Sequence, residues 1–386
     1  METRVPGRFK VAFIAGTRPE IIKIAPVYLI LSQQKDVKPI LINTGQHREM
    51  SHMFLEIFNL TPDYDLNIMK PGQTLGSMTT RILHELEVIL HKEKPDWVMV
   101  QGDTTSAFCG ALSAFYRQTP VGHIEAGLRT WNKYSPFPEE MNRTLIGRIA
   151  ELHFAPTQMA RNNLQKEGID QQKIIVTGNT VVDALHWIES QNHDFIDQDL
   201  ARIFSSKTHQ KIVTVTAHRR ESWAGGITDI SEAVGMLARS FPEVLYFFSV
   251  HPNPVVKDQV YAILSGIPNI FLHDPLDYRD FIKILSFSDL VITDSGGVQE
   301  EAPSLGVPVI ITRAMTERPE IIEAGMGFLT GTDRDAIIRF ASEILTKKTE
   351  KTAKTIFGDG KASQRITQSL LYTIGRTSEK PCEFTG

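Results

Sequence analysis

The feature that most constrains the fold is an alternation of short apolar runs with helical patterns, which occurs twice along the chain. In the first half, six apolar runs bounded by turn residues each predict a buried strand: Val11–Ala15, Ile40–Ile42, Trp97–Val100, Val121–Ile124, Leu152–Phe154 and Ile174–Val176. Between them lie stretches with apolar residues three and four positions apart, most clearly from Leu75 to Ile89. Such a series predicts a parallel sheet covered by helices on both faces.

The series then restarts, which predicts a second domain of the same kind. Its strands are expected at Val213–Val215, Leu245–Val250, Ile270–Leu272, Leu290–Ile292 and Val309–Ile311, with helices near residues 230–237, 281–285 and 337–345. The polar stretch from Ser190 to Gln210 is the predicted linker. The fold class is therefore α/β, with two Rossmann-like parallel-sheet domains. We expect the polar tail beyond Arg376 to be disordered.

Composition excludes several classes of protein. The 386 residues hold 41 Lys and Arg against 45 Asp and Glu, a net charge of −4, so no basic excess indicates a nucleic-acid or membrane-surface binder. Only Cys109 and Cys382 are present, which favours a reducing, cytoplasmic location. No apolar run approaches the roughly 18 residues of a membrane span, so we expect no membrane anchor.

Common cofactor motifs are absent. The sequence has no GxGxxG, GxxxxGK[ST], GxSxG, HExxH or CxxC pattern, so simple dinucleotide, nucleoside-triphosphatase, serine-hydrolase and zinc-protease chemistry lack their motifs. The 12 histidines are scattered, and His47 and His52 are five positions apart rather than four. We expect neither a metal nor a cofactor.

Four motifs remain, and each follows a predicted strand, where open α/β sheets bind ligands. In GTRPEIIK, residues 16–23, Arg18 stands at a helix start opened by Pro19, and Lys23 follows one turn later. A helix N-terminus with two cations suits a diphosphate. The alternative is an ordinary solvated helix cap.

The second motif, DSGGVQEEAPSLG, begins at Asp294. Ser295, Gly296 and Gly297 allow the backbone to approach a phosphate closely, and Glu301 lies about one helical turn further on, where it can accept hydrogen bonds from ribose hydroxyls. The alternative is a glycine-rich turn without function.

The third motif is a set of carboxylates on successive loops of the first domain, Asp103, Glu125 and Glu139, with Glu140 beside the last. Any one of them could cap a helix, as Asp103 could, but three loops converging on one sheet edge favour a catalytic cluster. The fourth is TAHRRES at the end of the first strand of the second domain, whose His218 can donate to a phosphate or carry a proton.

Taken together, the motifs resemble a known family. The segments GTRPEIIKIAP, QHREM, PDYDLNIM, GDTTS, HIEAGLRT, YSPFPEEMNRTL, TGNTVVDAL, HRRES, DSGGVQEEAPSLG and TERPE resemble, in order and spacing, the non-hydrolysing UDP-N-acetylglucosamine 2-epimerases, from about Phe9 to about Ser369. The resemblance implies the two-Rossmann fold of type-B glycosyltransferases, with a cleft between the domains. It implies an N-terminal domain at 1–189, a UDP-binding domain at 190–360, a helix at 361–376 that crosses back to the first domain, and a tail at 377–386.

The implied reaction interconverts UDP-N-acetylglucosamine and UDP-N-acetylmannosamine. UDP leaves C1 while the C2 proton is removed, giving a 2-acetamidoglucal, and UDP then adds back with the proton on the other face. The implied partners are UDP-N-acetylglucosamine and UDP, with no nucleic acid, membrane or cofactor, and we expect a homodimer.

Residue roles follow from the same motifs. Asp103, Glu125 and Glu139 resemble the acid/base carboxylates, with His218 assisting the leaving phosphate. The implied substrate contacts are Arg18, Lys23, Phe281, Ser295, Gly296, Gly297, Glu301, Arg318 and, through its backbone, Leu276, which stands where some relatives have Gln. Gln46, His47, Gln73 and Arg219 resemble a second, activating UDP-N-acetylglucosamine site.

Three alternatives remain open. A retaining type-B glycosyltransferase would share the fold and the nucleotide-binding turn, but no segment supplies an acceptor site. The same fold also hosts epimerases acting on UDP-diacetamido-uronic acids, although the YSPFPEEMNR and GTRPE segments favour the simpler N-acetylglucosamine substrate. A non-catalytic UDP-sugar sensor would have no use for carboxylates on three loops.

Overall fold

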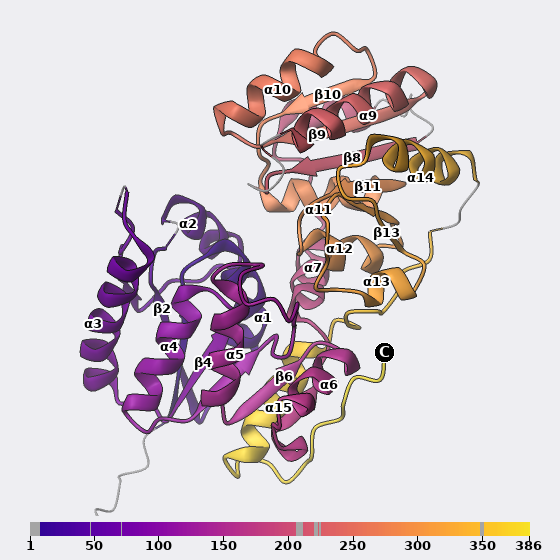
Figure 1. The fold of residues 1–386 in the computed structure, drawn as a ribbon. Helices are drawn as coiled ribbons and strands as arrows, with labels where there is room; N and C mark the ends of the chain where they lie inside the picture. The colour runs from indigo at the N-terminus through magenta and orange to yellow at the C-terminus, as the bar shows by residue number, and fades with distance from the viewer. Residues whose placement is uncertain are drawn as a thin grey trace, which may run out of the picture. The chain divides into compact units, whose positions relative to one another are not determined.

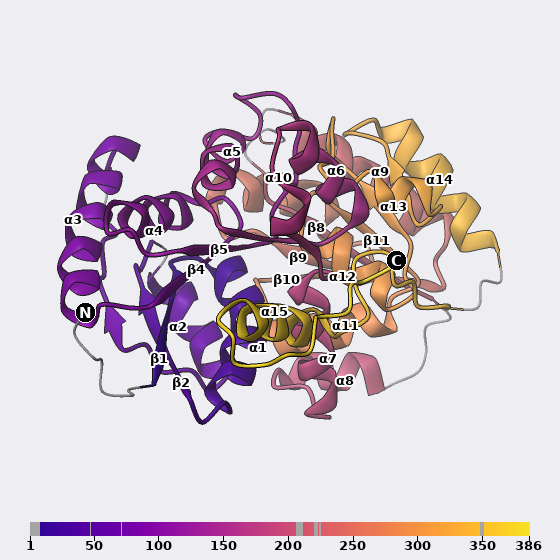
Figure 2. The same cartoon turned by 90° about the horizontal axis from the view of Figure 1, so that it is seen from below.

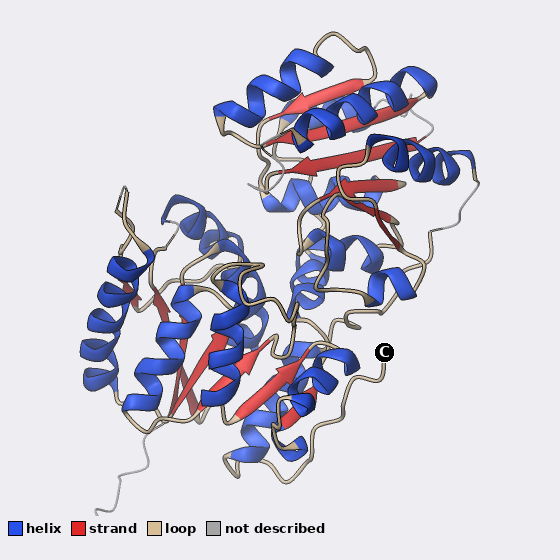
Figure 3. Ribbon diagram, in the orientation of Figure 1, coloured by secondary structure: helices blue, strands red, loops and turns tan. Residues whose placement is uncertain are grey.

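The computed structural model contains two parallel sheets, each in its own compact unit (Figures 1 and 3). It describes residues 8–46, 48–70, 72–205, 211–219, 223, 225–347 and 351–386. The first unit comprises residues 1–186 and 357–386, and the second comprises residues 187–356. Two α/β units with parallel strands confirm the predicted fold class.

The sheet of the first unit has the strand order β3-β2-β1-β4-β5-β6-β7. These strands are β1 (Phe9–Ala15), β2 (Val37–Asn43), β3 (Tyr64–Asp65), β4 (Trp97–Gln101), β5 (Val121–Ile124), β6 (Leu152–Ala155) and β7 (Ile174–Val176). The helices are α1 (Arg18–Ser32), α2 (Arg48–Ile57), α3 (Leu75–Glu93), α4 (Thr105–Tyr116), α5 (Glu139–Ile149), α6 (Gln158–Lys166), a 3-10 turn (Gln171–Lys173), α7 (Thr180–Ser190), which continues into the second unit, and α15 (Ala362–Thr373).

The sheet of the second unit has the order β10-β9-β8-β11-β12-β13. Its strands are β8 (Lys211–Ala217), β9 (Val244–Val250), β10 (Ile270–His273), β11 (Leu290–Thr293), β12 (Val309–Ile311) and β13 (Gly327–Leu329). Its helices are α8 (Gln198–Ser205), α9 (Gly226–Ser240), α10 (Pro254–Leu264), α11 (Tyr278–Phe287), α12 (Val298–Ser304), α13 (Glu320–Glu323) and α14 (Arg334–Thr346).

Burial of both sheet faces explains why these strands read as continuous apolar runs. The central strand β1 is fully buried from Val11 to Ile14. On one face, Met78, Ile82 and Leu86 of α3 join the core beside α4 and α5, as their spacing predicts. On the other face α1 packs against α15 (Figure 2).

Each sheet reverses its strand order once, and this decides where a ligand site can form. In the first unit β1 pairs with β2 on one side and with β4 on the other, and in the second unit β8 lies between β9 and β11. The loops that follow the two strands at such a reversal run in opposite directions and leave a crevice at the carboxyl ends. The GTRPE and GDTTS motifs follow β1 and β4, and the HRRES and DSGG motifs follow β8 and β11.

The prediction of a disordered tail beyond Arg376 is wrong. The Phe384 amide donates to the carbonyl of Val176 at 2.8 Å, and the Phe384 ring is 8% exposed, with the Arg365 guanidinium 5.6 Å from its centre. The tail therefore covers the open edge of β7, which would otherwise leave unpaired backbone groups.

The prediction of a linker from Ser190 to Gln210 is also wrong for the described residues, 190–205. This stretch contains α8, whose fully buried Leu200 packs in one cluster with Phe247 and Ile284 of the second unit. A segment with few apolar residues among many polar ones resembles a linker in sequence. A single stripe of buried apolar side chains is nevertheless enough to pack a short helix against the domain.

Two buried histidines give the first unit a pH-dependent stability. His123 and His153 are paired neighbours on β5 and β6, and each is 1% exposed. Burial lowers the pKa of His123 to about 3 and that of His153 to about 4. Their folded-state pKa values lie below the unfolded value of about 6.5, so this stabilisation is complete above about pH 6.5 and is lost as pH falls toward the folded values.

We expect His153→Leu to reduce the fall in the free energy of unfolding that accompanies a drop in pH. Between about pH 7 and about pH 5 the unfolded wild-type chain takes up a proton at position 153 that the folded chain does not, which costs about 2 kcal/mol. Urea unfolding at both pH values measures the difference. The exposed His84→Leu on α3 serves as the control, and an equal pH dependence in wild type and His153→Leu would contradict the prediction.

Candidate active site

The turn between β1 and α1 is held by a buried carboxylate of its own helix. Oε2 of Glu20 accepts hydrogen bonds from the amides of Gly16 (2.9 Å) and Thr17 (2.8 Å), and Oε1 accepts one from the Thr104 hydroxyl (2.5 Å). Burial raises the pKa of Glu20 to about 7, although these hydrogen bonds act in the opposite direction. A Cβ atom on Gly16 would lie 1.9 Å from Oγ1 of Thr44, so only glycine fits there.

The two cations that the sequence predicts for a diphosphate at this helix start have different surroundings. The amides that point at Glu20 belong to Gly16 and Thr17, directly before the helix, and Lys23 is buried in an ion pair with Glu125. Arg18 is exposed at the start of α1, and its guanidinium lies 5.8 Å from the centre of the Phe54 ring. Of the two predicted cations, Arg18 is thus the one directed outward.

Glu125 is the most strongly held of the predicted carboxylates. It follows β5 with a left-handed backbone (φ 64°) and is 9% exposed. Oε1 accepts hydrogen bonds from Lys23 Nζ and from Asn179 Nδ2 (2.9 Å), and Oε2 accepts one from Gln101 Nε2. The carboxylate is therefore fixed in one orientation beside a buried positive charge.

Asp103 is held by α5 and does not cap the helix that follows it. Thr104 is the N-cap of α4 and accepts from the Ala107 amide, so the capping alternative for Asp103 is excluded. Arg143 lies 2.5 Å from Oδ2 of Asp103, and Asn142 donates to its backbone carbonyl at 2.9 Å. The Asp103 side chain remains partly exposed at the reversal of the sheet.

The two glutamates at the start of α5 have different surroundings. Glu140 is 3% exposed, accepts hydrogen bonds from the amides of Thr130 and Trp131, and lies 3.4 Å from Arg143. Glu140 is thus a structural anchor for the preceding loop. Glu139 is the first residue of α5 and is partly exposed.

In the second unit, Asp294 holds the loop that carries His218. Oδ2 of Asp294 accepts from the amides of His218 and Arg219, both at 2.8 Å, and Oδ1 lies 2.9 Å from Nδ1 of His218. Burial alone would raise the pKa of Asp294, but the contacts with His218 and Arg219 hold it below its usual value. Asp294 therefore remains a carboxylate and turns Nε2 of His218 away from itself.

The glycine-rich turn after β11 is shaped by Arg318. A Cβ atom on Gly296 would lie 2.9 Å from Nη1 of Arg318, so a glycine is required for the guanidinium to approach the backbone. Arg318 is 8% exposed and is held by Glu300, whose Oε1 lies 2.5 Å from its Nε. Ser295 and Gly297 border this turn, and α12 begins directly after it.

The other predicted nucleotide contacts lie on α11, α12 and the loop before α11. Glu301 is 4% exposed and accepts a hydrogen bond from the Tyr278 hydroxyl at 2.6 Å. Leu276 packs against the cluster around Phe247, and Phe281 is partly buried on α11.

The residues of the predicted activating site lie in both units of the chain. Gln46 accepts a hydrogen bond from Ser106 at 2.9 Å, and Gln73 accepts one from Arg81, both in the first unit. Arg219 belongs to the second unit, and His47 lies outside the described residues.

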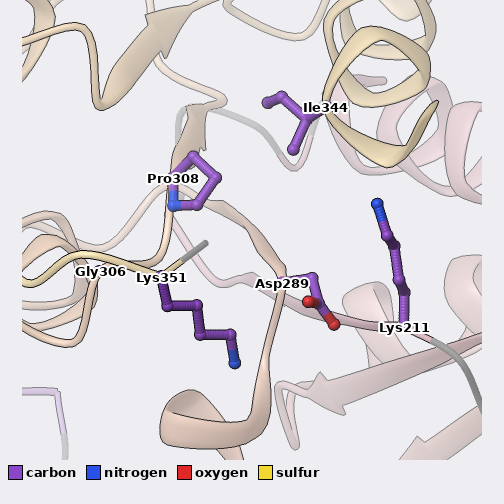
Figure 4. A pocket seen from close by; sticks show the side chains of 6 residues that line it. All are labelled: Lys211, Asp289, Gly306, Pro308, Ile344 and Lys351. Carbon is purple, nitrogen blue, oxygen red and sulfur yellow. The ribbon is translucent and has the colours of Figure 1, made fainter. Parts of the chain in front are cut away.

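A small cavity lies at the opposite edge of the second sheet, at the amino ends of its strands (Figure 4). Lys211 donates to the carbonyls of Leu345 and Lys347, and Lys351 donates to the carbonyl of Ser286, so both lysines hold the chain together. In the described part of the chain no cluster of His, Cys, Asp and Glu is suited to a metal ion, and no helix is long and apolar enough to cross a membrane.

Sequence reasoning missed the residues that hold the predicted ones. They are Glu20, Gln101, Arg143, Asn179, Tyr278 and Asp294. Most of them stand inside the quoted motifs, so the signal was present. What the sequence lacks is the pairing, because each contact joins different segments of the chain.

Comparison with known proteins shows the family to which this sequence is similar. A family model described as UDP-N-acetylglucosamine 2-epimerase matches residues 30–371. The UDP-N-acetylglucosamine 2-epimerase of Yersinia pestis is 46% identical over 368 residues, 94% of this chain and 98% of that protein. The enzyme of that name from Bacillus subtilis (strain 168) is 44% identical over 385 residues, 98% of this chain and 99% of that protein.

A solved structure extends the similarity to the whole fold. The crystal structure of UDP-GlcNAc 2-epimerase from Neisseria meningitidis bound to UDP-GlcNAc matches with a TM-score of 0.89 and 42% identity, over 94% of this chain and 99% of that one. With a family model that spans most of the chain and relatives that align over nearly their full length, the chain belongs to the non-hydrolysing UDP-N-acetylglucosamine 2-epimerase family.

Proposed function

We propose that this chain interconverts UDP-N-acetylglucosamine and UDP-N-acetylmannosamine by elimination and re-addition of UDP. The observation that carries the proposal is the placement of reactive groups after the strands at each sheet reversal. Carboxylates follow β4 and β5 in the first unit, and His218 and the glycine-rich turn follow β8 and β11 in the second. The named activity of the relatives and the UDP-GlcNAc in the Neisseria meningitidis structure support the same substrate.

The proposed chemistry avoids forming a carbanion at an unactivated carbon. In the first step a base takes the proton from C2, a double bond forms between C1 and C2, and the C1–O bond breaks so that UDP leaves with the electron pair. In the second step UDP adds to C1 of the 2-acetamidoglucal, and an acid returns a proton to the other face of C2. Both steps need acid/base groups near the ring and positive charge near the diphosphate.

Asp103, Glu125 and Glu139 form the proposed acid/base set. Glu125 is held by Lys23, Gln101 and Asn179, while Asp103 and Glu139 are more exposed. A rigid carboxylate with two less buried ones suits a reaction in which protons leave and arrive on opposite faces of one carbon.

In the second unit the proposed diphosphate contacts are Ser295, Gly296 and Gly297, with His218 nearby and Arg318 as another substrate contact. In the first unit the proposed diphosphate contact is Arg18. Asp294 orients the His218 ring, and Glu300 holds the Arg318 guanidinium against the Gly296 backbone. Phosphate oxygens can accept hydrogen bonds from these cations and from backbone amides. The activating site at Gln46, His47, Gln73 and Arg219, like the homodimer, stays a prediction.

The proposal is tested by following purified protein with UDP-N-acetylglucosamine alone in D2O by NMR. We expect UDP-N-acetylmannosamine with deuterium at C2 and a transient glucal. Product without deuterium would contradict the elimination route. Turnover only after addition of a sugar acceptor would indicate a glycosyltransferase, and turnover only of a uronic-acid substrate would indicate the related epimerase.

Amide substitutions test the acid/base set. We expect Asp103→Asn, Glu125→Gln and Glu139→Gln each to lower kcat by about 10²- to 10⁴-fold, because an amide cannot transfer the proton. Asp96→Asn is a matched control. Asp96 stands at the other end of β4 from Asp103, and its carboxylate accepts a hydrogen bond from the Lys10 amide at 2.9 Å. Near-normal turnover in all three folded variants would remove these residues from the mechanism.

The buried ion pair makes a separate prediction about stability. Lys23→Met leaves the Glu125 carboxylate buried without its cation, and we expect the free energy of unfolding to fall by about 3 to 5 kcal/mol. The double variant Lys23→Met/Glu125→Gln should recover part of the loss because it removes both charges. Urea unfolding measures all three proteins, and an unchanged midpoint for Lys23→Met would contradict the prediction.

Arg18 is expected to bind UDP without stabilising the fold. Loss of one charged hydrogen bond costs about 1.5 to 3 kcal/mol, so Arg18→Ala should weaken UDP binding roughly 10- to 150-fold in calorimetry. The unfolding midpoint without ligand should not change, since the side chain is exposed. Arg117→Ala, at the far end of α4, is the control, and a large stability loss in Arg18→Ala would make Arg18 structural.

A further inference from the structure

We infer that Tyr278 is a positioning residue that sets ribose recognition by holding the carboxylate of Glu301. The inference rests on the proposed function, in which Glu301 contacts the ribose hydroxyls of UDP. It adds a residue from another helix, because Tyr278 is the first residue of α11 whereas Glu301 lies in the first turn of α12.

The contact between the two side chains is short and buried. The Tyr278 hydroxyl lies 2.6 Å from Oε1 of Glu301, and the two residues are 6% and 4% exposed. A phenol has one proton to donate, and this distance is that of a hydrogen bond to a charged carboxylate. Tyr278 is itself fixed, because Asp277 caps α11 and burial holds the ring.

Glutamate needs such a partner to discriminate between sugars. Its side chain has three rotatable bonds, and an unfixed carboxylate must be ordered each time the ligand binds. The hydrogen bond from Tyr278 occupies one of about four lone-pair sites of the carboxylate, and a ribose 2′,3′-diol has two protons to donate. Tyr278 therefore fixes the orientation before the nucleotide arrives.

The loop that leads into α11 strengthens this assignment. Leu276 and Phe281, two of the predicted substrate contacts, lie two residues before and three residues after Tyr278. One short segment would thus contact the nucleotide and also orient the carboxylate that binds the ribose.

The test compares binding of UDP and of 2′-deoxy-UDP by calorimetry. A site built to hydrogen-bond a hydroxyl rejects the analogue that lacks it, so the wild type should prefer UDP. In Tyr278→Phe we expect UDP to bind about 10-fold more weakly, the equivalent of about 1.4 kcal/mol, and 2′-deoxy-UDP to change by less than about 3-fold. The preference for UDP over the deoxy analogue therefore falls.

Two further variants separate this role from simple packing. Tyr246→Phe removes the hydroxyl of a fully buried tyrosine on β9 that has no hydrogen-bond partner among the described residues, and it should leave the preference unchanged. In a Glu301→Gln background, Tyr278→Phe should have no further effect on the preference, because it acts through the carboxylate.

The outcomes are distinguishable. If Tyr278→Phe weakens both nucleotides equally, or if only Glu301→Gln changes the preference, Tyr278 is structural and the inference is overturned while the ribose assignment stands. If Glu301→Gln leaves the preference unchanged, the ribose assignment fails and the inference fails with it. The epimerase activity is tested in a separate experiment, the conversion of UDP-N-acetylglucosamine in D2O by the wild type. The two binding outcomes therefore leave the epimerase activity untouched.

Discussion

The pairing of β1 with β4 and of β8 with β11 is the constraint on which the candidate site residues of each unit depend. At each pair the strand order reverses, so the loops that follow the two strands diverge instead of covering the carboxyl ends. Arg18 and Asp103 stand after the first pair, and His218 and Ser295 after the second. The same backbone rule, applied in each unit, places these candidate residues at the carboxyl ends of the strands, where open α/β sheets bind ligands.

Buried carboxylates keep these loops in place. Glu20, Glu140 and Asp294 each accept hydrogen bonds from backbone amides of a loop that leads to a proposed site residue. Loop amides cannot pair within a strand or helix, and leaving them buried without an acceptor would cost about 1 to 3 kcal/mol each. The acidic residues in these motifs thus divide into those that accept hydrogen bonds from backbone amides and those, such as Asp103 and Glu125, that pair with side chains.

Much of the fold was predictable because the strands are buried on both faces. A strand such as Val11–Ala15 must be apolar throughout, and its pattern is visible without knowledge of its neighbours. The strands β3 and β13 were not predicted, because neither reads as a buried apolar run: β3 is the pair Tyr64–Asp65, and β13 begins with a glycine and ends with an exposed leucine. The tail was also missed, because Phe384 is buried only through its contact with β7, far away in the sequence.

The sequence by itself determined the class of fold, the family and the candidate site residues, because apolar periodicity and ordered motifs are local properties of the chain. The tertiary structure decided which groups are engaged. Lys23 and Arg18 look alike in GTRPEIIK, yet one is buried against Glu125 and the other is exposed. Tyr278 meets Glu301, and Asp294 meets His218, only in the folded chain. Hydrogen bonds and ion pairs depend on distances between segments, and these distances cannot be read from the order of the residues.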